Sequence, residues 1–320
     1  MNYNSWKTLP SSFAETVQLV EEFVVQEIIR ETKEKQLYYH TLDHAIAVKR
    51  RASSMLQKIQ LAVLPDPIVD DFERTKCLIL LCALAHDMVQ IFSKPGQDLM
   101  LRSRTPGISE AATADKLIEY ITNLNQALIQ ARVDPTILFS QSDLAAIKEI
   151  ILATICKLDP QAGKLTHTFS AASIYQPYLY ESGFKTSLSG KIIALADLGT
   201  LGMDGVEAYI QEGILIFLED NLDIKKLISN CDYLDVAVRE AVRVRLLNMA
   251  KFMVNLARER EVRFEIEISG FCPQVRRVLR EEVFIHLNHR SIEEIEEIIP
   301  TAQNTSLTEL INFFGLSEYR

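Results

Sequence analysis

Hydrophobic residues recur at intervals of three and four along much of the chain, the spacing that places them on one face of an α-helix. This period is clearest in four segments, residues 13–33, 75–88, 110–131 and 142–156. Alternation with period two, the pattern of a half-buried strand, occurs in "EVRFEIEIS". The chain is therefore expected to be all-α, with at most a short strand or extended piece at 261–269.

Serine residues mark where several of these helices are expected to begin. Ser109 precedes "EAATADKLIEYI", and Ser142 precedes "DLAAIKEIILATI", so each side chain is placed to accept a hydrogen bond from a free amide of the first turn. In the tail, the helices "SIEEIEEII" and "SLTELINFF" both begin with serine, and Ser306 with Glu309 makes a capping box.

The composition is that of a globular protein with a sizeable core, because 48% of its 320 residues are hydrophobic. Its formal net charge of −9 argues against a nucleic-acid polymer as partner, since such a partner needs a basic surface. The longest strongly apolar run, "CLILLCALA", is about half a membrane span, and the N-terminus lacks a signal-peptide pattern. A cytoplasmic protein without a membrane partner is therefore expected.

No flexible linker divides the chain. We therefore expect a helical core over residues 1–225 and a helical extension over residues 226–320 that packs on it. The long amphipathic helices of this extension leave a homodimer open.

Charged and imidazole side chains follow two of the apolar stretches. His86 and Asp87 directly follow "CLILLCALA", and Asp197 directly follows "IIALA". A carboxylate beside an imidazole at the end of an apolar helix is costly to desolvate, and a divalent cation would neutralise it directly. His40 and His44 lie four residues apart on one helical face and add further nitrogen donors. The candidate metal ligands are His44, His86, Asp87 and Asp197.

The order of these motifs resembles the HD-domain superfamily of metal-dependent phosphohydrolases. The resemblance rests on "YHTLDHAIAV" from His40 to His44, "HD" at 86 and 87, "LAT" ending at Thr154, and "ADL" around Asp197, and it covers about residues 38–200. The pattern is closest to cyclic-nucleotide phosphodiesterase-like HD domains. It implies an HD-type helical bundle holding a divalent metal ion.

The resemblance also implies a role for each motif residue. His44, His86, Asp87 and Asp197 would bind the metal, which is Zn, Mn, Fe, Co, Ni or Mg. His40 matches the histidine that donates a proton to the leaving oxygen. Glu110, in "ISEAATA", resembles the glutamate that holds the metal-bound water.

Two departures from the phosphodiesterase pattern bear on the number of metal ions. Thr41 replaces the usual asparagine after the first histidine, and Ile155 stands where those enzymes carry an aspartate that supports a second metal. Between the motifs, His167 is the one histidine left to build a second position. We therefore expect one divalent metal ion per chain.

Arg102 and Arg104 lie between the "HD" motif and Glu110 in a predicted loop. Guanidinium groups bind phosphate oxygens through paired hydrogen bonds, so both arginines are candidate substrate-binding residues. Two solvated loop arginines remain the alternative.

The expected activity is hydrolysis of a phosphomonoester or phosphodiester, with a nucleotide or cyclic nucleotide as the natural guess, by a metal-bound hydroxide. Its partner would be a small phosphorylated substrate. The alternative, suggested by Thr41 and Ile155, is a catalytically weak, metal-containing protein that binds or senses a ligand. A metal-dependent assay would separate the two.

Overall fold

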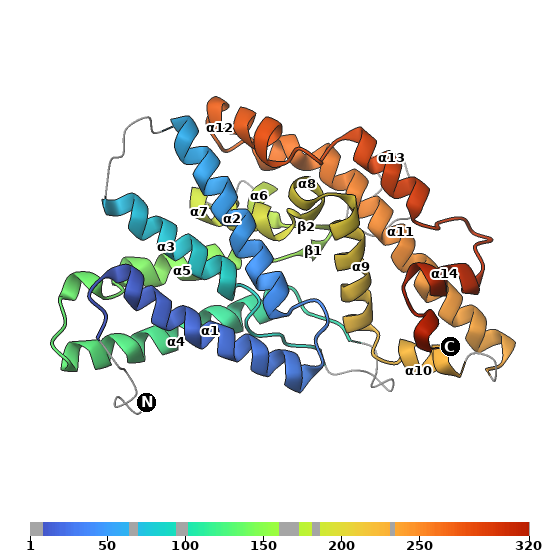
Figure 1. The fold of residues 1–320 in the computed structure, drawn as a ribbon, viewed down its shortest axis with the longest axis horizontal. Helices are drawn as coiled ribbons and strands as arrows, with labels where there is room; N and C mark the ends of the chain where they lie inside the picture. The colour runs from blue at the N-terminus through green and yellow to red at the C-terminus, as the bar shows by residue number, and fades with distance from the viewer. Residues whose placement is uncertain are drawn as a thin grey trace.

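The computed structural model describes residues 9–63, 70–93, 102–159, 173–180, 186–230 and 234–319. Across these ranges the chain forms α-helices and one two-stranded ribbon (Figure 1). This confirms the all-α class. Within the same ranges, none of the helices combines the length and the apolar character needed to cross a bilayer.

The first group of helices surrounds the site described below. Its members are α1 (Phe13–Lys35), α2 (Leu42–Val63), α3 (Asp70–Ala85), α4 (Ile108–Gln130), α5 (Gln141–Leu152) and α7 (Leu188–Asp197). A short 3-10 helix, η2 (Pro135–Ile137), joins α4 to α5.

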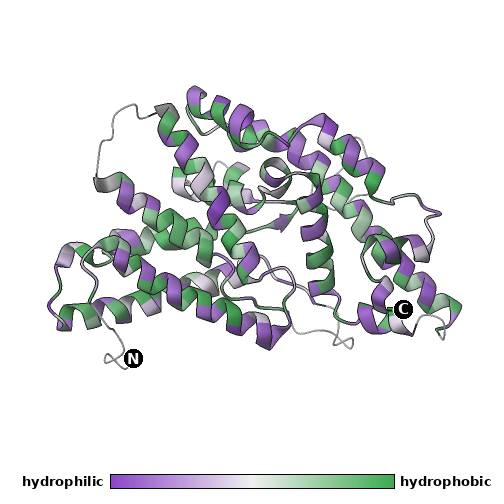
Figure 2. Cartoon of the chain, viewed as in Figure 1, coloured by the Kyte–Doolittle hydropathy of each residue, from purple (hydrophilic) through white to green (hydrophobic). Residues whose placement is uncertain are grey.

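Helix α3 is central to this group and contacts α1, α2, α5 and α7. Its second half is largely hydrophobic, whereas α1 and α2 alternate between polar and hydrophobic residues (Figure 2). Leu81, Cys82, Ala83 and Ala85 have no exposed surface. The polar residues that follow α3, starting with His86, therefore emerge inside the bundle rather than on its surface.

A small antiparallel ribbon follows α5. Strand β1 (Lys157–Leu158) pairs with β2 (Ile174–Tyr175), and Lys157 lies opposite Tyr175. The short helix α6 (Pro177–Tyr180) comes next and contacts α7 and α11.

The rest of the chain forms a second helical group. It comprises α8 (Thr200–Asp204), α9 (Val206–Asp220), α10 (Ile224–Ser229), α11 (Val236–Glu267), α12 (Pro273–Val278), the π-helix η4 (Leu279–Val283), α13 (His289–Ile298), α14 (Leu307–Phe313) and the 3-10 helix η5 (Ser317–Tyr319).

A second hydrophobic core belongs to this group and runs from Leu201 on α8 to Leu316 near the end of the chain. Helix α12 packs back on α2 (Figure 1), and η4 also contacts α2. Phe264, at the end of α11, belongs to the first core. The boundary expected between residues 225 and 226 falls inside α10.

The strand considered for "EVRFEIEIS" was wrong, because this segment is the last part of α11. Val262 and Ile266 are exposed there, whereas Arg263 and Glu267 are buried. Arg263 forms an ion pair with Glu259, one turn earlier on the same helix. This part of α11 buries charged residues together with Phe264 and exposes Val262 and Ile266, so the alternating hydrophobic pattern does not match its buried face.

The serine caps expected for α4 and α5 were also wrong in detail. Helix α4 begins after Gly107, whose φ of +85° suits glycine, and Ser109 instead accepts a hydrogen bond from the amide of Ile91. Helix α5 is capped by Ser140 rather than Ser142. In each case the helix starts two residues earlier than the serine suggests.

The two helices expected in the tail are present as α13 and α14. The capping box of Ser306 and Glu309 at the start of α14 is confirmed. Helix α13, in contrast, is capped by Asn288, whose side chain accepts from the amide of Ser291.

Candidate metal centre

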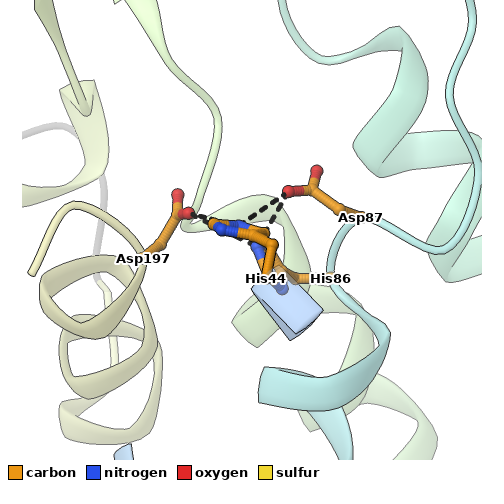
Figure 3. A group of neighbouring side chains, drawn as sticks. All are labelled: His44, His86, Asp87 and Asp197. Atoms are coloured by element: carbon orange, nitrogen blue, oxygen red, sulfur yellow. Dashed lines mark ion pairs between the residues drawn. The ribbon is translucent and has the colours of Figure 1, made fainter. Parts of the chain in front are cut away.

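Four side chains from three parts of the chain converge in the first helical group (Figure 3). His44 lies in the first turn of α2, His86 and Asp87 directly follow α3, and Asp197 is the last residue of α7. One ligand atom of each lies within 4.8 Å of the others. The structure therefore brings together all four residues that the sequence proposes as metal ligands.

The distances show two histidines between two carboxylates. The Nε2 atom of His86 lies 2.9 Å from Oδ2 of Asp87 and 3.3 Å from Oδ1 of Asp197. The Nε2 atom of His44 lies 3.5 Å from Oδ2 of Asp87 and 3.6 Å from Oδ1 of Asp197. Both Nε2 atoms thus face the same pair of carboxylate oxygens.

The hydrogen bond on the far side of His86 fixes which ring nitrogen faces the cluster. Its Nδ1 atom lies 2.9 Å from the carbonyl oxygen of Ala83, so Nδ1–H donates to that carbonyl. In the neutral ring, Nε2 then presents a lone pair to the two carboxylates, and it is buried without a hydrogen-bond partner. A metal-binding histidine is held in this way by its other nitrogen.

The electrostatics of the cluster favour positive charge at its centre. Burial opposes the charged form of His86, but the carboxylates of Asp87 and Asp197 beside Nε2 outweigh it and raise the pKa of His86 well above its usual range. The pKa of His44 is raised for the same reasons. Burial opposes ionisation of Asp197, but the neighbouring imidazoles of His44 and His86 lower its pKa to about 2.

Two glutamines orient the carboxylates. The side-chain amide of Gln90 donates to Oδ1 of Asp87 at 3.1 Å, which leaves Oδ2 facing the histidines. The amide of Gln176, directly after β2, donates to Oδ2 of Asp197 at 3.1 Å, which leaves Oδ1 facing them. Each carboxylate therefore has one oxygen held and one oxygen turned into the cluster.

His40 lies beside the cluster but outside the group of four. Its Nε2 atom is 3.7 Å from Oδ2 of Asp87. Its Nδ1 atom is 2.5 Å from Oε1 of Glu219, at the end of α9. Because Glu219 accepts at Nδ1, Nε2 is the ring atom left to face the site.

Backbone hydrogen bonds fix the position of the Glu219 carboxylate. It has no exposed surface, and its Oε2 atom accepts hydrogen bonds from the backbone amides of Tyr38, Tyr39 and His40 at 3.0, 2.9 and 3.1 Å. Burial would raise the pKa of Glu219, but the charge and hydrogen bond of His40, together with Arg104, lower it to about 2.

The structure separates the two candidate phosphate-binding arginines. Nη1 of Arg104 lies 2.9 Å and 3.0 Å from the two ring nitrogens of His40. An atom this close to both cannot lie in the ring plane without overlapping Cε1, so the guanidinium lies over the ring face. Its Nη2 donates to Asp220 at 2.6 Å. Arg102 instead donates to the carbonyls of Lys35 and Gln36 at the end of α1.

Three further residues bear on the expected site: Glu110, Ile155 and His167. Glu110, in the first turn of α4, is partly buried, and burial and the charges of Asp87 and Asp197 raise its pKa. Ile155 is buried and offers no metal ligand. His167 lies outside the described residues.

Sequence reasoning missed Glu219, Gln90 and Gln176. For Glu219 a signal exists, because "ILIFLED" is another apolar stretch that ends in carboxylates, as the stretches before Asp87 and Asp197 do. The two glutamines carry no such signal, because the sequence around an isolated glutamine does not show which group its side-chain amide contacts.

Comparison with known proteins adds no relative, because no protein-family model, curated protein or solved structure matches this chain. The case for a function therefore rests on the residues and geometry described above.

Proposed function

We propose that this chain is a metal-dependent phosphohydrolase that cleaves a small phosphomonoester or phosphodiester, with a nucleotide or cyclic nucleotide as the natural guess. The observation that carries the proposal is the orientation of His86. Its Nδ1–H donates to the carbonyl of Ala83, so Nε2 is the ring nitrogen that faces the two carboxylate oxygens, which is the orientation a metal-binding histidine needs.

The donor atoms fit a divalent cation. Two imidazole nitrogens and two carboxylate oxygens suit a borderline or hard divalent metal, here Zn, Mn, Fe, Co, Ni or Mg. Within the described ranges this is the single group of His, Cys, Asp and Glu side chains that could hold an ion. The proposal is therefore one metal ion per chain, held by His44, His86, Asp87 and Asp197.

When bound, a divalent cation supplies two things to phosphate ester hydrolysis: it activates water as a nucleophile and neutralises charge on the phosphoryl oxygens. The buried surroundings of His44 and His86 strengthen such charge interactions, because the local dielectric is lower than that of water. Gln90 and Gln176 keep the two carboxylates turned inward throughout.

His40 is placed to handle the proton of the leaving group. Glu219 accepts the Nδ1–H hydrogen bond and fixes the ring, so Nε2 is the atom that can exchange a proton with the leaving group. This atom faces the site at 3.7 Å from Asp87. Transfer from Nε2 to the departing oxygen would neutralise the charge that develops there.

Arg104 and Glu110 complete the proposed site. Arg104 is fixed over His40 by Asp220, and its guanidinium donors suit phosphoryl oxygens. The partly buried Glu110 is suited to orient the attacking water through a hydrogen bond. Arg102 has no part in the proposal, because its donors are used by backbone carbonyls of α1. The proposal places this reaction in the cytoplasm.

The proposal is tested with purified protein loaded in turn with Zn, Mn, Co, Ni or Mg. p-Nitrophenyl phosphate, bis-p-nitrophenyl phosphate and a panel of nucleotides serve as substrates. We expect metal-dependent release of phosphate or alcohol that is lost in Asp87→Ala. Tight binding of a nucleotide with no release under any metal would instead support the ligand-binding alternative.

A further inference from the structure

Helix α11 buries four charged side chains near its C-terminal end that the proposed reaction does not use. They are Glu259, Arg260, Arg263 and Glu267, and each is at most 5% exposed. Apolar side chains in place of a buried ion pair often leave a protein equally stable, so stability alone does not account for these charges. What apolar side chains could not supply is a set of directed bonds to another part of the chain.

Arg263 binds the ribbon that precedes Gln176. It forms an ion pair with Asp159, directly after β1, and its Nη1 donates to the carbonyl of Ile174 in β2 at 3.4 Å. The amide of Asp159 also donates to the carbonyl of Ser173 at 2.9 Å. Arg263 therefore binds both sides of the ribbon, and one of its contacts lies two residues before Gln176.

Glu267 binds the segment that follows Gln176. Its Oε1 atom accepts a hydrogen bond from the hydroxyl of Tyr180, the last residue of α6, and also pairs with Arg260. Within α6, the amide of Leu179 donates to the carbonyl of Gln176 at 3.0 Å. The contact with Glu267 therefore fixes the chain on the C-terminal side of the glutamine.

Gln176 lies between these two contacts and connects them to α7. It is 1% exposed, and its side-chain amide donates to Oδ2 of Asp197 at 3.1 Å. Helix α11 supplies none of the four candidate metal ligands, yet it holds the chain on both sides of the residue that orients one of them. A hydrogen bond weakens steeply as its distance and angle depart from the optimum, so a small shift of this segment would release Asp197.

We propose that Arg263 and Glu267 are positioning residues of the metal centre. By fixing residues 173–180 on both sides of Gln176, they place the amide that turns Asp197 toward the metal. This inference rests on the metal centre proposed above. It makes metal affinity depend on the second helical group, because loss of a partner that orients a metal ligand lowers metal affinity by about 10- to 100-fold.

NMR of metal-free protein tests the contact itself. In the full chain labelled with ¹⁵N-glutamine, the side-chain amide signal of Gln176 is assigned by its loss in Gln176→Leu. Arg263→Lys keeps the charge but not the fork of donors, and Tyr180→Phe removes one hydroxyl. We expect both variants to shift the Gln176 signal and to speed its exchange with solvent by about tenfold or more. An unchanged signal in both would overturn the positioning role.

Zinc affinity, measured by competition with a fluorescent chelator, tests whether this contact affects the metal. We expect zinc to bind about tenfold more weakly to Arg263→Lys and about threefold more weakly to Tyr180→Phe. Arg258→Lys is the matched control, because Arg258 lies on the same helix, pairs with Glu296 and is 30% exposed. It should bind zinc as the parent does. An equal loss in the control, or no loss in Arg263→Lys, would overturn the proposal.

A double variant separates positioning from general damage to the fold. Because Arg263 acts through Gln176, Arg263→Lys should cause no further loss of zinc affinity when Gln176→Leu is already present. A further loss as large as in the parent would overturn the proposal, since it would not pass through Gln176. A parent protein that binds no zinc would contradict the proposed metal centre, and the NMR measurement would still decide whether α11 places Gln176 against Asp197.

Discussion

The Nδ1 atom of His40 donates a hydrogen bond across 2.5 Å to Glu219, which lies 179 positions away in α9. His40 itself lies in the bend before α2, not on a helical face shared with His44 as the sequence suggested. The Glu219 carboxylate has no exposed surface, and it also accepts hydrogen bonds from the three backbone amides that precede α2. One residue from the second helical group thus sets both the ring orientation and the backbone of the motif "YYH". His40 and Glu219 should therefore behave as a unit.

Removing the proton donor should affect substrates according to their leaving groups. We expect His40→Ala to keep its metal content and to lower turnover of unactivated alkyl phosphates by about 10²-fold or more, because general acid catalysis contributes on that scale. Esters of p-nitrophenol need little protonation and should lose far less. Equal losses for both ester types would argue against a proton on Nε2.

Glu219→Gln should reproduce this pattern in a weaker form. An amide keeps the shape of the carboxylate, but it has one acceptor oxygen instead of two for the His40 ring and the backbone amides, so it positions His40 less well. We expect turnover of alkyl phosphates to fall by about tenfold or more with little change in KM. The double variant with His40→Ala should be no slower than His40→Ala alone, since Glu219 acts through His40. Additive losses, in folded protein of normal metal content, would show a separate role for Glu219.

Gln176 should control how tightly the metal is held. We expect Gln176→Leu to weaken metal binding by about 10- to 100-fold, because it removes the donor that fixes Oδ2 of Asp197. A chelator competition measures this directly. Gln274→Leu, at an exposed position on α12, is the matched control and should bind metal as the parent does. A similar effect in both variants would contradict the positioning role.

Asp204 should stabilise the contact between the two helical groups. It binds Arg50 at 2.6 Å and Arg51 at 2.7 Å, and Arg51, 1% exposed, also binds Glu212. We expect Asp204→Asn to lower the free energy of unfolding by about 2 kcal/mol at neutral pH, measured by urea denaturation. Asp115→Asn removes an exposed pair with Lys148 and should cost about 0.5 kcal/mol or less.

The Asp204 effect should depend on pH in a defined direction. Burial opposes ionisation of Asp204, but hydrogen bonds and charges of Arg50 and Arg51 lower its pKa in the folded protein. The stabilisation is therefore fully present above the unfolded pKa of about 4 and is lost as the pH falls through the lower folded value. The difference between the parent and Asp204→Asn should shrink in acid. A stability difference between the two proteins that grows as the pH falls would contradict the lowered pKa of Asp204.

Much of the candidate site could be predicted because its residues end apolar stretches. A carboxylate or imidazole after "CLILLCALA" or "IIALA" must lie near the core, where it needs a compensating charge. Arg102 and Arg104 show the limit of this reasoning. Both precede α4 in one loop, yet Asp220 brings Arg104 to the site while carbonyls at the end of α1 hold Arg102 away. Such partners are set by tertiary packing, which the local sequence does not encode.

The fold shows the same limit in α11. Its helical period is obscured because Arg263 and Glu267 are buried and charged, while Val262 and Ile266 face solvent. Arg263 pairs with Asp159, just after β1, and Arg260 pairs with Glu267. The rule that apolar residues are buried fails where charges are buried in pairs, and such pairs are recognised when the partner segments are seen together.

The central claim is that His44, His86, Asp87 and Asp197 hold one divalent metal ion, and elemental analysis of the purified, untreated protein tests it most directly. The account predicts about one equivalent of a divalent metal per chain in the parent, and a loss of at least about 90% of it in Asp87→Ala and His86→Ala with the fold intact by circular dichroism. Metal-free protein that also takes up no Zn, Mn, Co, Ni or Mg from solution would contradict it, as would equal metal content in all three proteins.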